Sequence, residues 1–220
     1  NFNCDKIMLE EKKMKRTIKD FDLEGKKIII RCDLNVPIEN GVITDDTRIV
    51  ASLRTIKYAL RFNTKIILLS HLGKIKTEED KKKNSLYPVV ERLREYLNTE
   101  VLFSPDTCSD RLTDMVNNMK WKSVLLIENT RFEDVPNKRE SECNDDLAKY
   151  WASLGDIFIN DAYGTCHRNH TSITGIPKYL PSGVGFLVEK ELQKIDSVLD
   201  AKTHPFIAVL GGKKVDDKIV

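Results

Sequence analysis

The chain has 220 residues, and its 36 lysine and arginine residues against 34 aspartate and glutamate residues give a net charge of +2 at pH 7. This near-balance argues against a dedicated nucleic-acid or polybasic membrane binder, and no apolar run approaches the roughly 18 residues that a membrane-spanning helix needs. Hydrophobic residues make up 40% of the chain and charged residues 32%, as in a folded globular protein rather than a disordered tail.

The ends of the chain and its cysteines predict a cytoplasmic location. Residues 1–14 contain no apolar stretch of the kind that forms a secretory signal, and we expect them to be an extension ahead of the first domain. The five cysteines are odd in number and include no C-x-x-C pair, so we expect free thiols in a reducing compartment.

Residues 216–220 have the character of the middle of a helix, which predicts that the chain is part of a longer protein.

Short runs of isoleucine, valine and leucine recur along the chain and predict parallel β-strands. The runs are continuous rather than alternating, as expected for strands that helices cover on both faces. The expected strands span residues 27–33, 65–70, 101–103, 123–127, 156–160 and 206–210.

Amphipathic helices are predicted between these strands. Each has an apolar stripe at helical spacing, and the simplest interpretation of a stripe is packing against the sheet. The stripes begin at Ile49, Val89, Leu112, Leu147 and Val188. Strands that alternate with helices predict an α/β fold, here a Rossmann-like three-layer αβα domain with a parallel sheet of about six strands. Residues 161–181 have no such stripe, and we expect a long functional loop there.

Polar side chains follow four of the expected strands at the point where each strand ends. In an open parallel sheet, ligands bind beyond the carboxyl ends of the strands, so these side chains are expected to share one edge. The side chains are those of Arg31, Asp33, Asn35, His71, Lys74, Glu128, Asn129, Arg131, Asn160, Asp161, His167, Arg168 and His170, and Gly73 and Gly164 lie in the same segments. Each of the four strands contributes a cation, so the pattern predicts a local basic pocket for a small, highly charged anion.

Arg48 is expected near the same edge, in the first turn of a helix. A cation there opposes the helix dipole, although Asp45 and Asp46 soften the cost. For any single arginine, a solvated surface charge is the simpler explanation. The prediction of an anion site therefore depends on the joint placement of several cations.

Other motifs are weaker. His167 and His170 beside Cys166 have a spacing found in metal sites, but one cluster without a second ligand pair is poor evidence, and we expect no metal ligand in this chain. Gly183 and Gly185 lack the third glycine of a dinucleotide-binding fingerprint.

The last expected strand runs into Gly211 and Gly212, which are followed by Lys213, Lys214 and Lys218. Glycines after a strand let backbone N–H groups approach a phosphate, and Lys214 and Lys218 would share one face of a helix. A turn followed by a solvated basic helix explains these residues equally well.

Five segments of the chain resemble motifs of the phosphoglycerate kinase family, and they occur in the family's order over residues 15–220. Each resembled motif is given after its segment: Arg31-Cys32-Asp33-Leu34-Asn35-Val36-Pro37 (R-x-D-x-N-V-P), Ser70-His71-Leu72-Gly73 (S-H-L-G), Glu128-Asn129-Thr130-Arg131-Phe132 (E-N-x-R-F), Asn160-Asp161-Ala162-Tyr163-Gly164-Thr165-Cys166-His167-Arg168 (N-D-A-F-G-T-A-H-R) and Gly211-Gly212-Lys213-Lys214-Val215-Asp216-Asp217-Lys218 (G-G-x-K-V-x-D-K).

The resemblance implies a two-domain kinase of glycolysis that transfers a phosphoryl group from 1,3-bisphosphoglycerate to ADP, giving 3-phosphoglycerate and ATP, with Mg²⁺ accompanying the nucleotide. It implies a phosphoglycerate-binding domain over residues 15–185, an interdomain helix over 186–201 and the start of a nucleotide-binding domain over 202–220. The family's chains are longer, so the resemblance places the magnesium ligand beyond this chain and implies binding without turnover by these 220 residues. We expect a monomer.

Carried over residue by residue, the resemblance also assigns roles to site residues. The residues implied to bind the acid are Asp33, Asn35, Arg48, His71, Lys74, Arg131 and Arg168. Those implied to bind the nucleotide are Gly211, Gly212, Lys214 and Lys218. Arg48, Lys214 and Lys218 are implied to be catalytic. Lys74 stands where the family usually has arginine, and Lys213 where it usually has a small residue.

Two other functions stay open on the sequence. A non-catalytic anion-binding or interaction domain would use the same basic pocket. A nicotinamide-dependent enzyme could be built on a similar sheet, but the missing three-glycine fingerprint disfavours it.

Overall fold

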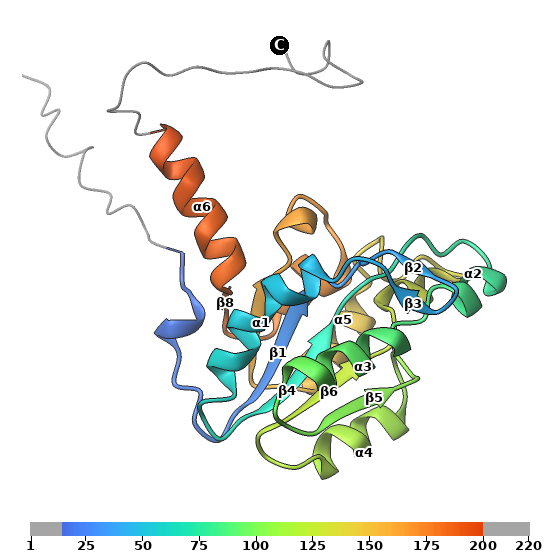
Figure 1. The fold of residues 1–220 in the computed structure, drawn as a ribbon, viewed down its shortest axis with the longest axis horizontal. Helices are drawn as coiled ribbons and strands as arrows, with labels where there is room; N and C mark the ends of the chain where they lie inside the picture. The colour runs from blue at the N-terminus through green and yellow to red at the C-terminus, as the bar shows by residue number, and fades with distance from the viewer. Residues whose placement is uncertain (1–14, 200–220) are drawn as a thin grey trace, which may run out of the picture.

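A computed structural model describes residues 15–199 of the chain (Figure 1). Its centre is a six-stranded sheet in which all neighbouring strands are parallel, in the order β5-β6-β4-β1-β7-β8. The strands are β1 (Lys27–Cys32), β4 (Lys65–Leu69), β5 (Val101–Ser104), β6 (Ser123–Ile127), β7 (Ile157–Asp161) and β8 (Ser182–Val184). The predicted α/β fold with about six parallel strands is confirmed.

Five predicted strands form with their ends shifted by one residue at most, and the strand expected over 206–210 lies outside the described residues. Strand β8 is additional, because Ser182, Gly183 and Val184 form no apolar run. It lies at the edge of the sheet beside β7. A Cβ atom on Gly183 would lie 2.6 Å from the ring of Phe21, so only glycine allows this close approach.

The apolar stripes all form helices: α1 (Thr47–Ala59), α3 (Tyr87–Tyr96), α4 (Asp110–Asn118), α5 (Asp145–Ser153) and α6 (Phe186–Leu199). The segment expected to be one long loop differs from the prediction. It contains short helical turns at Tyr163–Thr165, Thr171–Gly175 and Ile176–Lys178. The middle turn buries Thr171 and Ser172 completely, so this segment packs into the domain as part of its structure.

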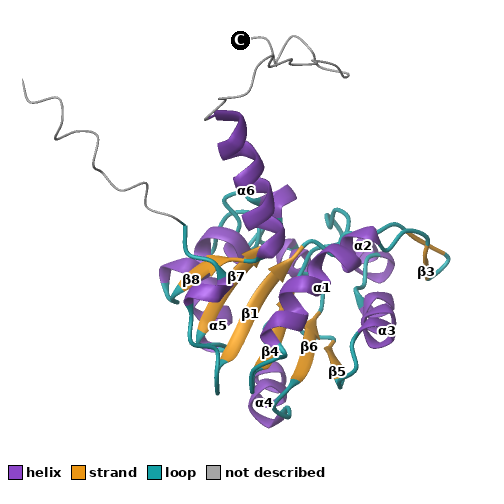
Figure 2. Cartoon of the chain, turned by 60° about the vertical axis from the view of Figure 1, so that its left-hand side comes forward, coloured by secondary structure: helices purple, strands orange, loops and turns teal. Residues whose placement is uncertain are grey.

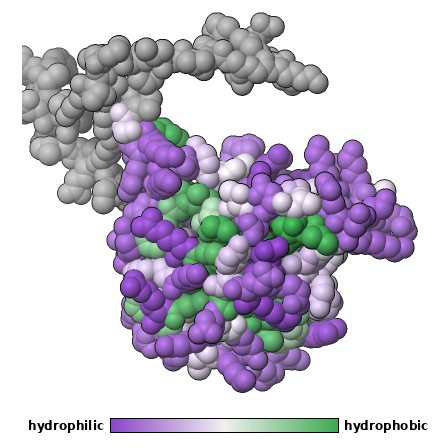
Figure 3. Space-filling view, viewed as in Figure 1, coloured by the Kyte–Doolittle hydropathy of each residue, from purple (hydrophilic) through white to green (hydrophobic). Residues whose placement is uncertain are grey.

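Two smaller elements complete the domain. A two-stranded hairpin joins β2 (Ile38–Glu39) to β3 (Val42–Ile43) through Asn40 and Gly41, whose φ angles are 50° and 80°. The short helix α2 (Glu78–Lys83) begins with a capping box between Thr77 and Asp80. The arm that carries α2 is covered by hydrophilic residues (Figure 3).

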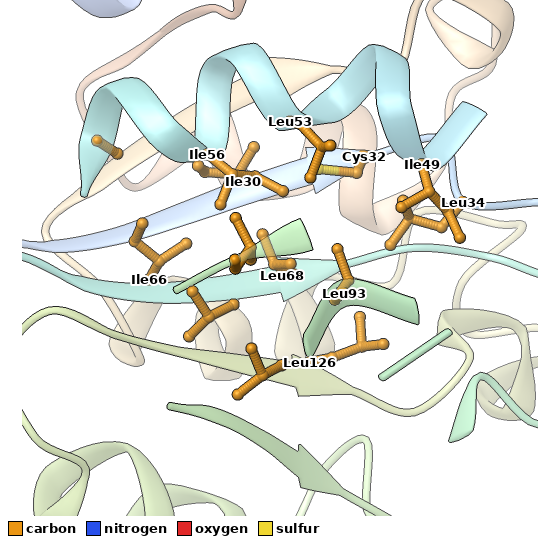
Figure 4. Close-up of a cluster of buried hydrophobic side chains, with 14 of the residues drawn as sticks. Ile30, Cys32, Leu34, Ile49, Leu53, Ile56, Ile66, Leu68, Leu93 and Leu126 are labelled. Carbon is orange, nitrogen blue, oxygen red and sulfur yellow. The ribbon is translucent and has the colours of Figure 1, made fainter. Parts of the chain in front are cut away.

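Helices cover both faces of the sheet, because alternate residues of each strand point to opposite sides. Ile28 and Ile30 of β1 pack with residues of α1 and α3, whereas Ile29 packs with residues of α4 and α5. Figure 2 shows the layers, and Figure 4 shows part of the core between α1 and the strands. The continuous apolar strands predicted this three-layer arrangement.

Helix α6 leaves the domain at the carboxyl edge of the sheet and projects away from it (Figure 1). Its first residue, Phe186, packs edge-on against Tyr58 of α1, with ring centroids 5.2 Å apart. Asp161 at the end of β7 accepts a 2.9 Å hydrogen bond from the backbone N–H of Leu187. Within residues 15–199, no helix combines the length and the apolar character needed to cross a bilayer.

Candidate anion-binding site

The loops after β1, β4, β6 and β7 meet at one edge of the sheet. These four strands are neighbours and run in the same direction, so their carboxyl ends lie side by side. In register, Arg31 of β1 lies between Leu69 of β4 and Asn160 of β7. The polar residues that follow these strands are thus brought together, as the pattern predicts.

A cavity of about 280 Å³ opens at this edge. Its lining residues are Arg31, Asn35, His71, Gly73, Lys74, Arg131, Thr165, Arg168 and His170. Four of them carry a positive charge at neutral pH, and no carboxylate is among them. A small, partly enclosed space surrounded by cations attracts an anion with several negative charges. Asn35, His71, Lys74, Arg131 and Arg168 were all assigned to the acid site from the sequence.

Asp33 and Arg48, the other two residues assigned to the acid site, pair with each other beside the cavity. Arg48 Nη1 lies 2.6 Å from Asp33 Oδ2, and neither residue is among those that line the cavity. The Arg48 side chain is 51% exposed and the Asp33 side chain 13%. The pair therefore links the first turn of α1 to the loop after β1.

Arg31 was predicted from its position after an apolar run to lie at this edge, but the acid-binding residues assigned from the resemblance did not include it. It lies inside β1, is 1% exposed, and donates hydrogen bonds to Ser172 Oγ (2.9 Å) and to the carbonyl oxygen of Cys32. Burial lowers the pKa of its guanidinium group, while the charges of Glu140 and Asp33 raise it. Its sequence position indicates a special role, because an arginine at the end of an apolar run becomes buried with its strand, and a buried charge needs charged partners or a ligand.

The two histidines of the cavity are held in the neutral state. Burial, together with the neighbouring arginines, lowers the pKa of His71 to about 3 and that of His170 to about 4. Neutral imidazoles still offer one N–H donor each. His170 was predicted from the sequence to lie at this edge and was also noted in a weak metal pattern; in the structure it lines the cavity.

The loop that carries His71 and Lys74 is fixed by hydrogen bonds to the loops after β1 and β6. The backbone N–H of Gly73 donates to Asn35 Oδ1 at 2.9 Å, and Ser70 Oγ accepts from the N–H of Leu34 at 2.9 Å. Asn129 donates its side-chain N–H groups to the carbonyl oxygens of Leu72 (2.7 Å) and Asn84 (2.9 Å). These bonds tie the loops after β1, β4 and β6 into one wall of the cavity.

Glu128, next to Asn129, fastens the start of α3 to the same wall. Its carboxylate accepts hydrogen bonds from the Ser85 hydroxyl (2.5 Å), the Leu86 N–H (2.7 Å) and the Asn129 N–H (2.7 Å). Burial raises the pKa of Glu128, and these three bonds lower it. Glu128 therefore does not line the cavity, and its carboxylate instead fixes the backbone at Leu86 and Asn129.

The residues assigned to the nucleotide, Gly211, Gly212, Lys214 and Lys218, lie outside the described residues. Among residues 15–199, no three histidine, cysteine, aspartate or glutamate side chains are grouped so that they could hold a metal ion. His167 is exposed, whereas His170, the other histidine of the weak metal pattern, is buried.

Solved structures share this fold. The phosphoglycerate kinase of Coxiella burnetii superposes with a TM-score of 0.79 at 36% sequence identity, over 93% of this chain and 50% of that one. The phosphoglycerate kinase of Pyrococcus horikoshii OT3 superposes with a TM-score of 0.78 at 32% identity, over 91% of this chain and 50% of that one.

Sequence comparisons agree with the structural ones. Phosphoglycerate kinases of Enterococcus faecalis and Fusobacterium nucleatum are 55% identical over 206 residues and 53% identical over 209 residues. These matches cover 93% and 94% of this chain, which spans about half the length (52%) of either relative. The family model described as phosphoglycerate kinase matches residues 18–220. The chain therefore belongs to the phosphoglycerate kinase family.

Proposed function

We propose that this chain binds 3-phosphoglycerate and 1,3-bisphosphoglycerate in the cavity at the carboxyl edge of its sheet, as the acid-binding part of a phosphoglycerate kinase that transfers a phosphoryl group to ADP. The observation that carries the proposal is the set of four cations, Arg31, Lys74, Arg131 and Arg168, around a cavity of about 280 Å³. The names of the relatives, all phosphoglycerate kinases, support the same activity.

The chemistry of the lining suits a phosphorylated hydroxy acid. Arginine can grip a carboxylate or phosphate with two parallel hydrogen bonds, and Asn35 and the neutral histidines can bind uncharged or carboxylate oxygens. Phosphoryl transfer requires mainly positioning and stabilisation of charge, which such residues supply. Arg48 would release Asp33 and stabilise the transferring group, while Asp33 would bind the acid's hydroxyl group.

We also propose the domain division implied by the family: a phosphoglycerate-binding domain over residues 15–185, an interdomain helix over 186–201 and the start of a nucleotide-binding domain over 202–220. The projection of α6 away from the domain supports its role as the connecting helix (Figure 1). Gly211, Gly212, Lys214 and Lys218 would then meet the nucleotide phosphates, with Lys214 and Lys218 acting on the transferred group.

Magnesium would accompany ADP or ATP. The residues around the cavity do not fit this ion, because magnesium prefers carboxylate and water oxygens and the lining supplies cations instead. No step is therefore assigned to the metal in this part of the protein.

Free thiols at all four described cysteines, Cys32, Cys108, Cys143 and Cys166, support the proposed cytoplasmic location. We further propose that the protein acts as a monomer.

Isothermal titration calorimetry with 3-phosphoglycerate tests the proposal. The 220-residue protein should bind the acid, and binding should weaken as salt is added. Replacing Arg131 or Arg168 with alanine should weaken binding at least tenfold, while the exposed Arg111→Ala on α4 serves as the matched control. Equal binding by all three variants would refute the assignment. If sulfate bound as tightly as 3-phosphoglycerate, the alternative of a general anion-binding domain would be favoured. If NAD bound and 3-phosphoglycerate did not, a nicotinamide-dependent enzyme would be favoured.

A further inference from the structure

A row of four polar side chains, three of them buried, leads from the interior of the domain to the cavity wall. In order of contact it consists of Glu140, Ser172, Arg31 and His71. The first three are no more than 1% exposed, and they come from the segment before α5, the helical turn at Thr171–Gly175 and strand β1. His71 and Arg31 also line the cavity, so the row connects a fully buried carboxylate to the site.

Hydrogen bonding fixes the direction of the first contacts. Glu140 accepts a bond from the Ser172 hydroxyl and another, at 3.0 Å, from the backbone N–H of Ser172. A serine hydroxyl has one proton, so its oxygen can only accept at its other contact. That contact is Arg31 Nε, at 2.9 Å. Glu140 therefore orients the hydroxyl so that its lone pair faces the guanidinium group.

The contact between Arg31 and His71 determines which ring nitrogen is protonated. Arg31 Nη2 lies 3.1 Å from His71 Nδ1. Arginine has donors and no acceptor, so Nδ1 must accept and the proton of the neutral ring must be on Nε2. The third guanidinium nitrogen, Nη1, donates to the carbonyl oxygen of Cys32, which limits rotation of the group.

The surroundings of His71 disfavour its charged form. The groups that face it are the cations Arg31, Arg131 and Arg168 and the neutral His170. Glu140, the one carboxylate in the row, lies behind Ser172 and 3.9 Å from Nδ1 of His170 rather than beside His71. His71 therefore presents a neutral N–H donor to the cavity.

We propose that Glu140 and Ser172 are positioning residues of the site: they hold Arg31, and through it keep His71 as the neutral Nε2–H tautomer, ready to donate a hydrogen bond to an oxygen of the bound acid. Only the identity of that acid rests on the proposed function. The tautomer itself is a property of the free protein and can be measured without any ligand.

Long-range ¹H–¹⁵N correlation spectra of the free, ¹⁵N-labelled 220-residue protein at pH 7 report the tautomer directly, with the His71 signals identified by their loss in His71→Gln. Wild-type protein should give the Nε2–H pattern. Ser172→Ala should lose this single tautomer and bind 3-phosphoglycerate about tenfold more weakly, a change of about 1.4 kcal/mol. Glu140→Gln, which keeps the size of the side chain, should shift the same signals.

Ser123→Ala is the matched control, because Ser123 is also buried but lies at the opposite end of the sheet, where its hydroxyl bonds to the carbonyl of Lys120. It should leave the tautomer and the affinity unchanged. The proposal is overturned if wild-type His71 has its proton on Nδ1 or is doubly protonated, or if folded Ser172→Ala keeps the Nε2–H pattern. A correct tautomer in a protein that does not bind 3-phosphoglycerate would refute the proposed function and leave the positioning role intact.

Discussion

The side-chain amide of Asn129 donates a 2.7 Å hydrogen bond to the carbonyl oxygen of Leu72, so that a residue after β6 holds the loop after β4. Its oxygen also accepts the backbone N–H of Arg131 at 3.1 Å. Asn129 thus sets the positions of cationic and imidazole side chains on two sides of the cavity without lining it.

Replacing Asn129 with alanine should lower the free energy of unfolding by about 2–3 kcal/mol, because the buried carbonyl group of Leu72 and the partly buried carbonyl group of Asn84 lose their donor. Urea denaturation monitored by circular dichroism measures the change. The exposed Asn98 provides the control, and Asn98→Ala should change stability by less than about 0.5 kcal/mol. Comparable stabilities for the two variants would show that Asn129 does not hold the loop.

The sequence predicted most of the fold because its local signals agree with its packing. Runs such as 124–127 are apolar along their whole length, and the structure buries them on both faces. β8 could not be predicted this way, since Ser182, Gly183 and Val184 are stabilised by their place beside β7 and not by their own composition. The hairpin turn at Asn40 and Gly41 does have a recognisable signal, a dipeptide that readily adopts positive φ.

The candidate site was predictable where its residues follow strands. His71, Lys74, Arg131 and Arg168 all come after an apolar run, and the rule that parallel strands end at one edge brings them together. Arg31 was expected at this edge too, but its burial within β1 beside Ser172 and Glu140 was not predicted, because these partners are more than 100 residues away in the sequence. No local pattern encodes such a contact.

Substituting Lys74 with arginine should strengthen binding of 3-phosphoglycerate by about threefold to tenfold, since a guanidinium group can form two parallel hydrogen bonds with a phosphate where an ammonium cannot. Calorimetric titration measures the affinity. Lys82→Arg on α2, where the side chain is exposed and paired with Glu79, is the control for a general effect of arginine. Weaker or unchanged binding in Lys74→Arg would mean that Lys74 does not contact the phosphate.

Gly73→Ala should destabilise the protein more than Gly41→Ala. Both glycines have positive φ angles, 60° and 80°, which cost about 1–2 kcal/mol for a residue with a Cβ atom. At Gly73 the new atom would also lie 2.3 Å from Asn84 Oδ1, whereas at Gly41 it would meet nothing within 4 Å. Thermal unfolding of both variants separates the two costs, and equal losses would contradict the close packing at Gly73.

Stability should fall as the pH drops from about 6.5 toward 4. Unfolded histidine has an ordinary pKa of 6.5, while burial lowers the pKa of folded His71 to about 3 and of His170 to about 4. Over this range the unfolded chain binds protons that the folded chain does not, so acid favours unfolding by up to about 1.4 kcal/mol per pH unit for each histidine.

Unfolding measured at pH 6 and pH 5 tests this linkage. His71→Asn should make stability less dependent on pH than in the wild type, because one of the two histidines no longer titrates. His167→Asn removes an exposed imidazole and should leave the dependence as it is. The same slope in the wild type and both variants would show that His71 is not held neutral by the fold.

The most direct test of the central claim is a crystal structure of the protein with 3-phosphoglycerate. The acid should lie in the cavity at the carboxyl edge of the sheet, with its negatively charged oxygens within hydrogen-bond distance of Arg31, Arg131 or Arg168 and one oxygen close to His71 Nε2. An acid bound elsewhere on the molecule, with this cavity holding only solvent, would contradict the account.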